Sequence, residues 1–395
     1  MTAESLATTP ASAVWYRDPR IRALIFQALA LVLVIYVGWY LANNTVQNMA
    51  RQGIASGFDF LENTAGFALI QTLIPYSETS SYGIALIVSL LNTILLAFVG
   101  VLLATMLGFV MGVARLSNNW LVRKLATIYI ETFRNIPLLL QIFFWYHAVL
   151  KPLPGPRESI DLGGLFFINN RGVYLPALES GWGFLGIVVT FILGIIVATF
   201  ISRWAKARQA RTGEQFPMFA VGLALVIGAP LLVWVILSFI VGYDVPKLTG
   251  FNFEGGIVII PEFIAMLLAL SVYTASFIAE IVRAGIQSVS HGQTEAAHAL
   301  GVRPGPTLKL VIIPQALRVI IPPLTSQYLN LTKNSSLATA IAYPDLTAVF
   351  AGTVLNQTGQ AVEIIGITMA VYLTISLLTS AYMNWYNAKK ALVER

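Results

Sequence analysis

Long stretches of this chain contain no Asp, Glu, Lys or Arg, and this feature limits the possible folds more than any other. A helix of about 20 mostly apolar residues crosses the hydrocarbon core of a bilayer. Five stretches are long enough: Arg22 to Arg51, Glu78 to Arg115, Glu179 to Arg203, Glu214 to Asp244, and Glu363 to Lys389. Only 11% of the 395 residues are charged and 57% are hydrophobic. These values exclude a soluble globular enzyme and a disordered chain.

Three further charge-free stretches are shorter, and they cross only if charged residues lie at or inside the membrane boundary: Arg134 to Lys151, Glu262 to Glu280, and Arg318 to Lys333. The sequence therefore predicts an all-α polytopic membrane protein. We expect about eight transmembrane helices, near residues 21–42, 85–113, 129–150, 182–202, 216–243, 257–279, 307–333 and 361–387. The first, fourth and fifth could face lipid on all sides. The third, sixth and seventh should face protein or a water-filled path.

The basic residues predict the orientation of these helices. Arg17, Arg20 and Arg22 precede a first span that is too long for a signal-peptide core, so we expect an uncleaved helix with a cytoplasmic N-terminus. With eight spans, the cytoplasmic segments then hold 18 Lys and Arg against 7 Asp and Glu, and the opposite side holds 6 against 11. This asymmetry favours cytoplasmic N- and C-termini. It also accounts for the net charge of +6 without nucleic acid.

The predicted cytoplasmic segment between the sixth and seventh spans contains a short run of helix-forming residues. Gly292 lies before the run, which extends from Gln293 to Leu300, and Gly301 follows as a good C-terminal stop. Glu295 offers a charge, and the small side chains of Ala296 and Ala297 let another surface approach closely. On physical grounds alone, a docking helix and a loop helix without a partner fit this pattern equally well.

The spacing within this segment resembles a known family. Glu295-Ala296-Ala297, Gly301, nine residues, and then Val311-x-Ile313-Pro314 resemble the EAA loop of ABC importer permeases. Residues 131–141, 273–283 and 331–337 resemble segments of the polar amino-acid permeases. The resemblance covers five predicted spans, which matches the five-helix core of type I ABC importer permeases. The three additional helices and the insertion near 151–256 look like the long permeases of broad-specificity importers for glutamate, glutamine, aspartate, asparagine and other L-amino acids.

This resemblance implies a transmembrane subunit that takes up L-amino acids across the bacterial inner membrane. The implied partners are a second permease in a heterodimer, two ATP-binding subunits and a periplasmic amino-acid-binding protein. The chain has no GxxxxGK[ST] phosphate loop, so hydrolysis of ATP is expected on a separate subunit rather than on this one. We expect no cofactor and no metal, since cysteine is absent and His291 and His298, which could share a helix face, have no third ligand near them.

The same resemblance implies a division of the chain into four parts. Residues 1–84 would form an N-terminal tail, an extra helix and a periplasmic segment. Residues 85–150 would form the first part of the permease core, and 151–256 an insertion with two extra helices. Residues 257–395 would complete the core and include the cytoplasmic coupling loop 292–314. The residues expected to couple the chain to the ATPase are Gly292, Glu295, Ala296, Ala297, Gly301 and Pro314.

The seventh predicted span contains the candidates for a substrate path. Lys333 lies fifteen residues after Arg318, about 22 Å along a helix, where a lone ammonium costs at least ~2.5–3.5 kcal/mol. Lys333 must therefore snorkel, pair with Asp345 or Glu363, or line a water-filled path that attracts a carboxylate. Structural contacts between helices remain the alternative for its polar neighbours. The path candidates are Ser326, Gln327, Asn330, Lys333, Asn334 and Ser335.

Prolines and charge pairs mark possible hinges and gates. Proline removes a hydrogen bond from the helix ladder, and such breaks are tolerated at membrane depth where the backbone is buried in protein or lines a cavity. Glu280 and Arg283 are three residues apart and are expected to pair at a helix end, as are Glu131 and Arg134. The hinge and gate candidates are Pro137, Gln141, Glu280, Arg283, Pro322 and Pro323.

A secondary transporter or channel that acts without an ATPase is the alternative function. It would conduct ions or couple uptake to ions in the absence of ATP. An internal repeat would favour it, and the sequence shows none.

Overall fold

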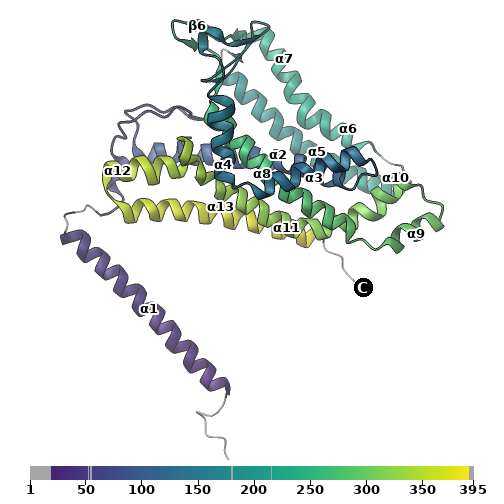
Figure 1. The fold of residues 1–395 in the computed structure, drawn as a ribbon, viewed down its shortest axis with the longest axis horizontal. Helices are drawn as coiled ribbons and strands as arrows, with labels where there is room; N and C mark the ends of the chain where they lie inside the picture. Colours follow the sequence, from purple (N-terminus) through teal and green to yellow (C-terminus); the bar gives the residue numbers. More distant parts are fainter. Residues whose placement is uncertain (1–18, 52, 54–55, 179–180, 215, 391–395) are drawn as a thin grey trace, which may run out of the picture.

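The computed structural model describes residues 19–51, 53, 56–178, 181–214 and 216–390 (Figure 1). Most of these residues are helical. The α-helices are α1 Pro19–Arg51, α2 Tyr82–Arg115, α3 Trp120–Asn135, α4 Leu138–Phe143, α5 Gly181–Thr212, α6 Met218–Leu223, α7 Ala229–Val241, α8 Pro261–Gln287, α9 His291–Ala299, α10 Pro304–Thr307, α11 Ile313–Asn334, α12 Leu355–Thr358 and α13 Ala361–Lys390. Short 3-10 or π-helical segments are η2 Asp59–Glu62, η3 Phe144–Leu150, η4 Pro156–Glu158, η5 Ala224–Gly228, η6 Leu308–Ile312, η7 Ser335–Ile341 and η8 Thr347–Val354.

Seven helices in the described part of the chain are long and apolar enough to cross a membrane. They are Pro19–Arg51, Tyr82–Arg115, Gly186–Thr212, Ala220–Ile240, Pro261–Gln287, Pro304–Ile341 and Ala361–Lys389. Each coincides with one of the predicted spans. The polytopic helical fold is therefore confirmed, with one long span fewer than the eight expected.

The predicted third span, 129–150, is not a single helix. Helix α3 ends at Asn135, and the backbone is extended at Ile136 and Pro137 before α4 begins. The apolar part that follows, Leu138–Leu150, is short. At 1.5 Å per residue its thirteen residues reach about 20 Å, less than the bilayer core. The missing N–H of Pro137 prevents the continuous helix that the charge-free stretch suggested.

Helices α2, α8 and α11 form the centre of the molecule and approach one another through glycines. A Cβ atom added at Gly108 of α2 would lie 2.6 Å from Ile278 of α8, and one at Gly112 would lie 2.7 Å from the carbonyl oxygen of Ala279. One added at Gly285 of α8 would lie 2.3 Å from Ile320 of α11. Association in lipid depends on such close packing, because burial of apolar surface gains little there.

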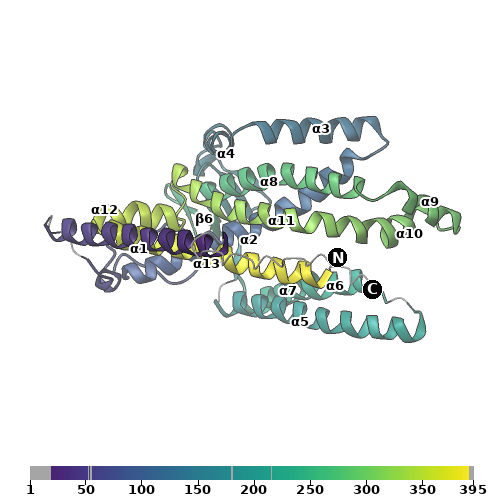
Figure 2. The ribbon, with the colours of Figure 1, turned by 90° about the horizontal axis from the view of Figure 1, so that it is seen from below.

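The additional helices are packed differently. No described residue of α1 is buried, and Figure 1 shows α1 projecting away from the other helices. Helices α5 and α7 lie side by side as a hairpin at the edge of the molecule (Figure 2). Gly194 of α5 meets the backbone of Leu225, where an added Cβ would lie 2.3 Å from the carbonyl oxygen.

Short strands in the insertion were not predicted. They gather at one end of the α5–α7 hairpin, around the β6 label of Figure 1. One antiparallel sheet has the order β1-β2-β3-β8, and two pairs join β4 to β5 and β6 to β7. The strands are β1 Ile160–Leu162, β2 Phe166–Asn169, β3 Gly172–Leu175, β4 Ala177–Leu178, β5 Tyr243–Asp244, β6 Lys247–Thr249, β7 Asn252–Glu254 and β8 Ile257–Ile259.

Candidate functional site

Helix α9 lies beyond the ends of the other helices, at the right of Figure 1. The side chain of Glu295 is 72% exposed, and its Oε1 lies 3.1 Å from Nδ1 of His291. Ala296 is exposed, Leu300 is 83% exposed, and Ala297 is buried against the molecule. Helix α9 and Leu300, the residue that follows it, therefore expose a carboxylate, a small side chain and a large apolar one. This combination suits insertion into a groove of another protein.

The two ends of α9 have different structures. The helix begins at His291, so Gly292 is its second residue rather than a break before it. At the other end, Gly301 has a φ of +74°, and the N–H of Val302 donates to the carbonyl oxygen of Ala297 at 3.0 Å. This left-handed glycine and its six-residue hydrogen bond end the helix as the sequence predicts.

A side-chain contact joins α9 to the long helix that follows it. Gln315 Nε2 donates to Gln293 Oε1 at 3.3 Å. Helix α10, the π-helical η6 and α11 form a continuous helical stretch from Pro304 to Asn334. Pro314 is the second residue of α11, and the widened turn of η6 directly precedes it. A side-chain contact therefore joins α9 to a helix long enough to cross a membrane.

A cluster of charges joins the ends of α2, α3 and α8. Arg115 contacts Glu280 at 2.5 Å and Glu131 at 3.0 Å. Glu280 also pairs with Arg283, the pair that the sequence predicts. Glu131 pairs with Arg115 of another helix rather than with Arg134, so the second predicted pair is replaced by a longer-range contact. Arg115 thus holds carboxylates from two neighbouring helices.

The side chain of Gln141 closes the break between α3 and α4. Its Nε2 donates to the carbonyl oxygens of Phe133 at 3.0 Å and Ile136 at 2.9 Å, on the far side of Pro137. Gln141 is buried, and its Oε1 has no partner among the described residues. The break is therefore held in one geometry by two hydrogen bonds from one amide.

Several polar residues in the second half of α11 share one exposed face. Pro323, Ser326, Asn330 and Lys333 recur at intervals of three or four residues, and all four are exposed. Gln327 is half-buried beside them. We call Ser326, Gln327, Asn330 and Lys333 the polar face of α11. An exposed row of amides and an ammonium at membrane depth requires water or another protein against it.

The remaining α11 candidates lie off this face or beside it. Pro322 is exposed within the helix, next to Pro323. Asn334 is half-buried where α11 passes into η7. Ser335 is fully buried, and its hydroxyl donates to the carbonyl oxygen of Thr332 at 2.7 Å. The structure therefore brings four of the six path candidates together and leaves Ser335 inside the fold.

Lys333 does not form either of the ion pairs considered from the sequence. Asp345 accepts a hydrogen bond from the hydroxyl of Tyr372 at 3.1 Å, and Glu363 accepts one from the backbone N–H of Gly57 at 2.9 Å. Within the part of the chain that the structure describes, neither carboxylate pairs with Lys333. Of the three alternatives for Lys333, two remain: its ammonium group snorkels to the membrane surface, or it lines a water-filled path.

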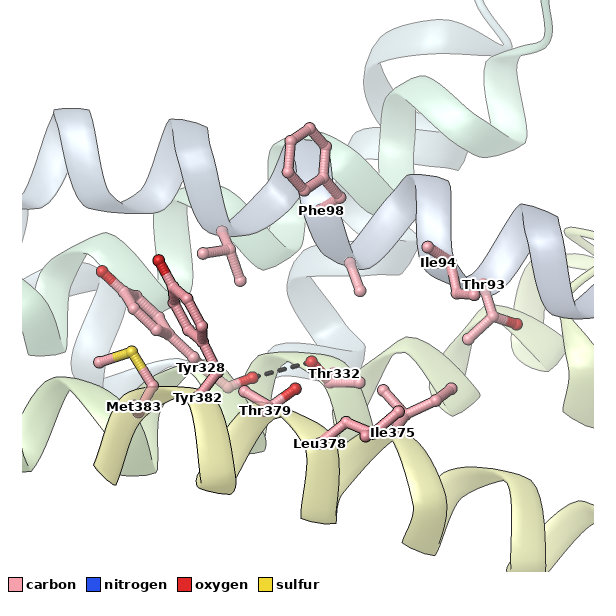
Figure 3. Close-up of a pocket in the computed structure, with 12 residues that line it drawn as sticks. Thr93, Ile94, Phe98, Tyr328, Thr332, Ile375, Leu378, Thr379, Tyr382 and Met383 are labelled. Atoms are coloured by element: carbon pink, nitrogen blue, oxygen red, sulfur yellow. Dashed lines mark hydrogen bonds between the residues drawn. The ribbon is translucent and has the colours of Figure 1, made fainter. Parts of the chain in front are cut away.

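A cavity of about 430 Å³ lies on the other side of α11, between α2 and α13 (Figure 3). Thr332 donates within its helix to the carbonyl oxygen of Tyr328 at 2.9 Å, and the Tyr328 hydroxyl accepts from Thr105 at 2.9 Å. The other hydroxyls that line it are those of Thr93, Thr379 and Tyr382. None of the lining side chains is charged. The cavity fits an apolar group better than the two charges of an amino acid.

Sequence reasoning missed this cavity because its lining is nearly all apolar or hydroxyl-bearing, and because α13 reads as an ordinary membrane helix. In the described residues, no group of three or more His, Asp or Glu side chains could hold a metal ion.

Comparison with known proteins gives a family for the chain. Residues 215–391 match the family described as binding-protein-dependent transport system inner membrane component. The chain is 54% identical over 380 residues to the putative amino-acid ABC transporter permease protein YhdX of Escherichia coli (strain K12), with 96% of this chain and 97% of that protein covered.

Two further relatives align over almost their whole length. The general L-amino acid transport system permease protein AapQ of Rhizobium johnstonii is 51% identical, with 100% of both chains covered. The glutamate/glutamine/aspartate/asparagine transport system permease protein BztB of Rhodobacter capsulatus is 44% identical, with 96% of each chain covered. The similarity therefore extends through the first helix and the insertion as well as the EAA loop.

Proposed function

Since the chain belongs to the family of amino-acid ABC transporter permeases, we propose that it forms half of the path by which polar L-amino acids, the acidic ones and their amides among them, enter the cell. It is a multi-pass membrane protein and the permease subunit of an ABC importer for L-amino acids. The observation that supports the proposed path is the polar face of α11, which is exposed in the single chain within a helix long and apolar enough to cross a membrane.

A second permease subunit is the partner that this face requires. Two permeases that meet along their α11 helices would enclose water between two polar rows and exclude lipid from both. Lys333 would attract a carboxylate of the substrate, and Gln327 and Asn330 would accept and donate hydrogen bonds without selecting one charge. The relatives that carry general and acidic or amide amino acids support this breadth.

Helix α9 is the proposed contact with the ATP-binding subunits. Hydrolysis on a separate chain would move α9, and the Gln293–Gln315 contact together with the continuous α10–α11 helix would carry that motion to the polar face. ATP must favour one conformation over the other for this coupling to do work. We place α9 in the cytoplasm, with both termini on the same side, in the bacterial inner membrane. A periplasmic binding protein would deliver substrate to the opposite side.

We also propose the division of the chain into a transport core and additions. Residues 85–150 and 257–395 would form the core, with the coupling loop at 292–314. Residues 1–84 and 151–256 would be additions around it. The glycine contacts among α2, α8 and α11 lie within the proposed core, and the α5–α7 hairpin lies in the insertion.

The importer reconstituted in liposomes with its native partners tests the coupling. We expect substrate-loaded binding protein to stimulate ATP hydrolysis and uptake. Glu295→Lys should abolish that stimulation, because it reverses the charge on the free face of α9. Glu214→Lys is a matched control on another exposed glutamate. Retention of stimulated hydrolysis in Glu295→Lys would remove α9 as the contact, and full uptake without ATP would indicate the secondary transporter instead.

Uptake kinetics test the substrate path separately. Lys333→Ala and Gln327→Ala should each lower uptake at limiting substrate about tenfold, the expected effect of losing a hydrogen bond to a charged group. Met369→Ala changes an exposed side chain of α13 outside the polar face and serves as the control. Assembly with the partners should be unchanged in all three variants. Unchanged uptake in both path variants would contradict the assignment.

A further inference from the structure

We propose that a cavity between the charged end of α5 and the start of the α10–α11 helix binds the phosphate headgroup of an anionic phospholipid. The cavity measures about 600 Å³. Its described lining includes Ser202, Gln209 and Phe216 from the added hairpin, and Pro306, Lys309 and Leu310 from the segment that follows α9. Two regions far apart in the sequence therefore share it. The inference rests on α5 lying in a membrane and is independent of which substrate is transported.

The cavity lies at the depth where a headgroup is found. Helix α5 is free of charge through Ile201, and Arg203 is its first charged residue, so Ser202 marks the end of its apolar part. The ring of Trp204 lies edge-on to Phe216, with centroids 5.5 Å apart. Tryptophan at such a boundary is typical of the membrane–water interface, where an apolar ring body and a polar tip are both accommodated.

The cavity is lined both by hydrogen-bond donors, which a phosphate needs, and by apolar groups, which suit the rest of a phospholipid. Lys309 is exposed, and no carboxylate lines the cavity or pairs with Lys309 in the described residues. The hydroxyl of Ser202 and the amide of Gln209 are further donors for phosphate oxygens. The ring of Phe216 and the aliphatic side chain of Leu310 suit the glycerol and the first methylenes of the acyl chains. Basic pockets between membrane helices at this level bind anionic headgroups.

Arg208, the neighbour of Gln209 in α5, is already engaged, and Lys309 is the charged residue in the described lining of the cavity. Arg208 pairs with Glu214 at 2.6 Å and lies over the ring of Trp204, 5.6 Å from its centroid. Lys309 lies in the segment that follows α9. A bound phosphate would therefore join this segment to the hairpin of the insertion. The added hairpin would in this way be tied to the moving segment through a lipid.

Native mass spectrometry of the purified full chain tests this site. Short-chain phosphatidylglycerol, phosphatidylcholine and inorganic phosphate are titrated separately into the detergent solution. We expect one phosphatidylglycerol to be retained in preference to phosphatidylcholine. Lys309→Gln should weaken that binding about fivefold, the effect of one basic residue near a headgroup. Arg211→Gln removes a charge from the end of α5, outside the cavity lining, and should change the affinity less than about twofold.

Three results would overturn the proposal. Equal retention of phosphatidylglycerol and phosphatidylcholine would show that no headgroup is selected. Equal weakening in Lys309→Gln and Arg211→Gln would indicate general attraction to a basic surface. Binding of inorganic phosphate at the same concentrations as the lipid, lost in Lys309→Gln, would assign the cavity to free phosphate. Because Lys309 and Arg211 are both exposed, neither substitution should affect folding.

Discussion

Helix α8 and the helix of residues 220–240 both qualify as membrane spans, yet they differ sharply in how much protein surrounds them. In their most apolar stretches of 18 residues, 56% of α8 is buried against 6% of 220–240. Helix α8 carries Glu280 and Arg283, while 220–240 contains no charged residue. Lipid solvates an apolar helix on every side, so apolarity alone does not bring a helix to the centre. Polar groups and small residues that permit close approach decide which helices are buried.

The largest effect should come from filling a close contact in the centre. Gly112→Ala would place a methyl group 2.7 Å from the carbonyl oxygen of Ala279 and force α2 away from α8. We expect a loss of about 1–3 kcal/mol in stability. Gly366→Ala in α13 adds the same methyl group in open space and should be neutral or slightly stabilising. Thermal denaturation of the purified proteins in detergent compares them, and equal midpoints would contradict the close packing.

The two arginine clusters offer a smaller contrast. Arg115 is 19% exposed and joins carboxylates of α3 and α8, whereas Arg208 is 42% exposed and pairs with Glu214 just beyond the end of its own helix. Arg115→Gln should cost about 1–2 kcal/mol, because it leaves two carboxylates short of a partner. Arg208→Gln should cost less than about 0.5 kcal/mol. The same denaturation measurement ranks them. A larger loss in Arg208→Gln would reverse the distinction drawn between centre and hairpin.

The smallest effect on transport should follow from loosening the hairpin itself. Gly194→Ala would meet the Leu225 carbonyl oxygen at 2.3 Å and separate α5 from η5. Hydrogen exchange over residues 186–212 and 220–240 should accelerate, while uptake stays within about twofold of the unmodified importer. Faster exchange in α8, or a loss of uptake well beyond about twofold, would show that the hairpin is part of the transport core.

Much of the architecture could be predicted from charge spacing, since a long charge-free stretch has few alternatives to a membrane helix. The prediction of a third span was wrong because a count of charges does not detect the extended backbone at Ile136 and Pro137. The strands were missed because they are two to four residues long, too short for an alternating pattern to be recognised. The glycine pairs at 163–164 and 255–256, all with positive φ, were the available turn signals.

The candidate site was predictable where it lies on one helix. The three- and four-residue spacing on α11 is a property of the sequence, and the structure adds that Ser326, Asn330 and Lys333 are exposed. The pairing of Arg115 with Glu131 and Glu280 was not predictable, because it joins three helices whose relative positions no local pattern specifies. The cavity of Figure 3 depends likewise on where α13 meets α2.

The exposure of the polar face of α11 to water in the assembled importer is the central claim, and thiol modification tests it most directly. The chain contains no cysteine, so Asn330→Cys and Met369→Cys each introduce its only thiol. A charged, membrane-impermeant methanethiosulfonate is applied during ATP-driven turnover, and modification of this chain is read by mass. The account predicts rapid modification of the Asn330→Cys variant and none of the Met369→Cys variant, whose side chain would lie in lipid. An unreactive thiol at position 330 beside a reactive one at 369 would contradict it.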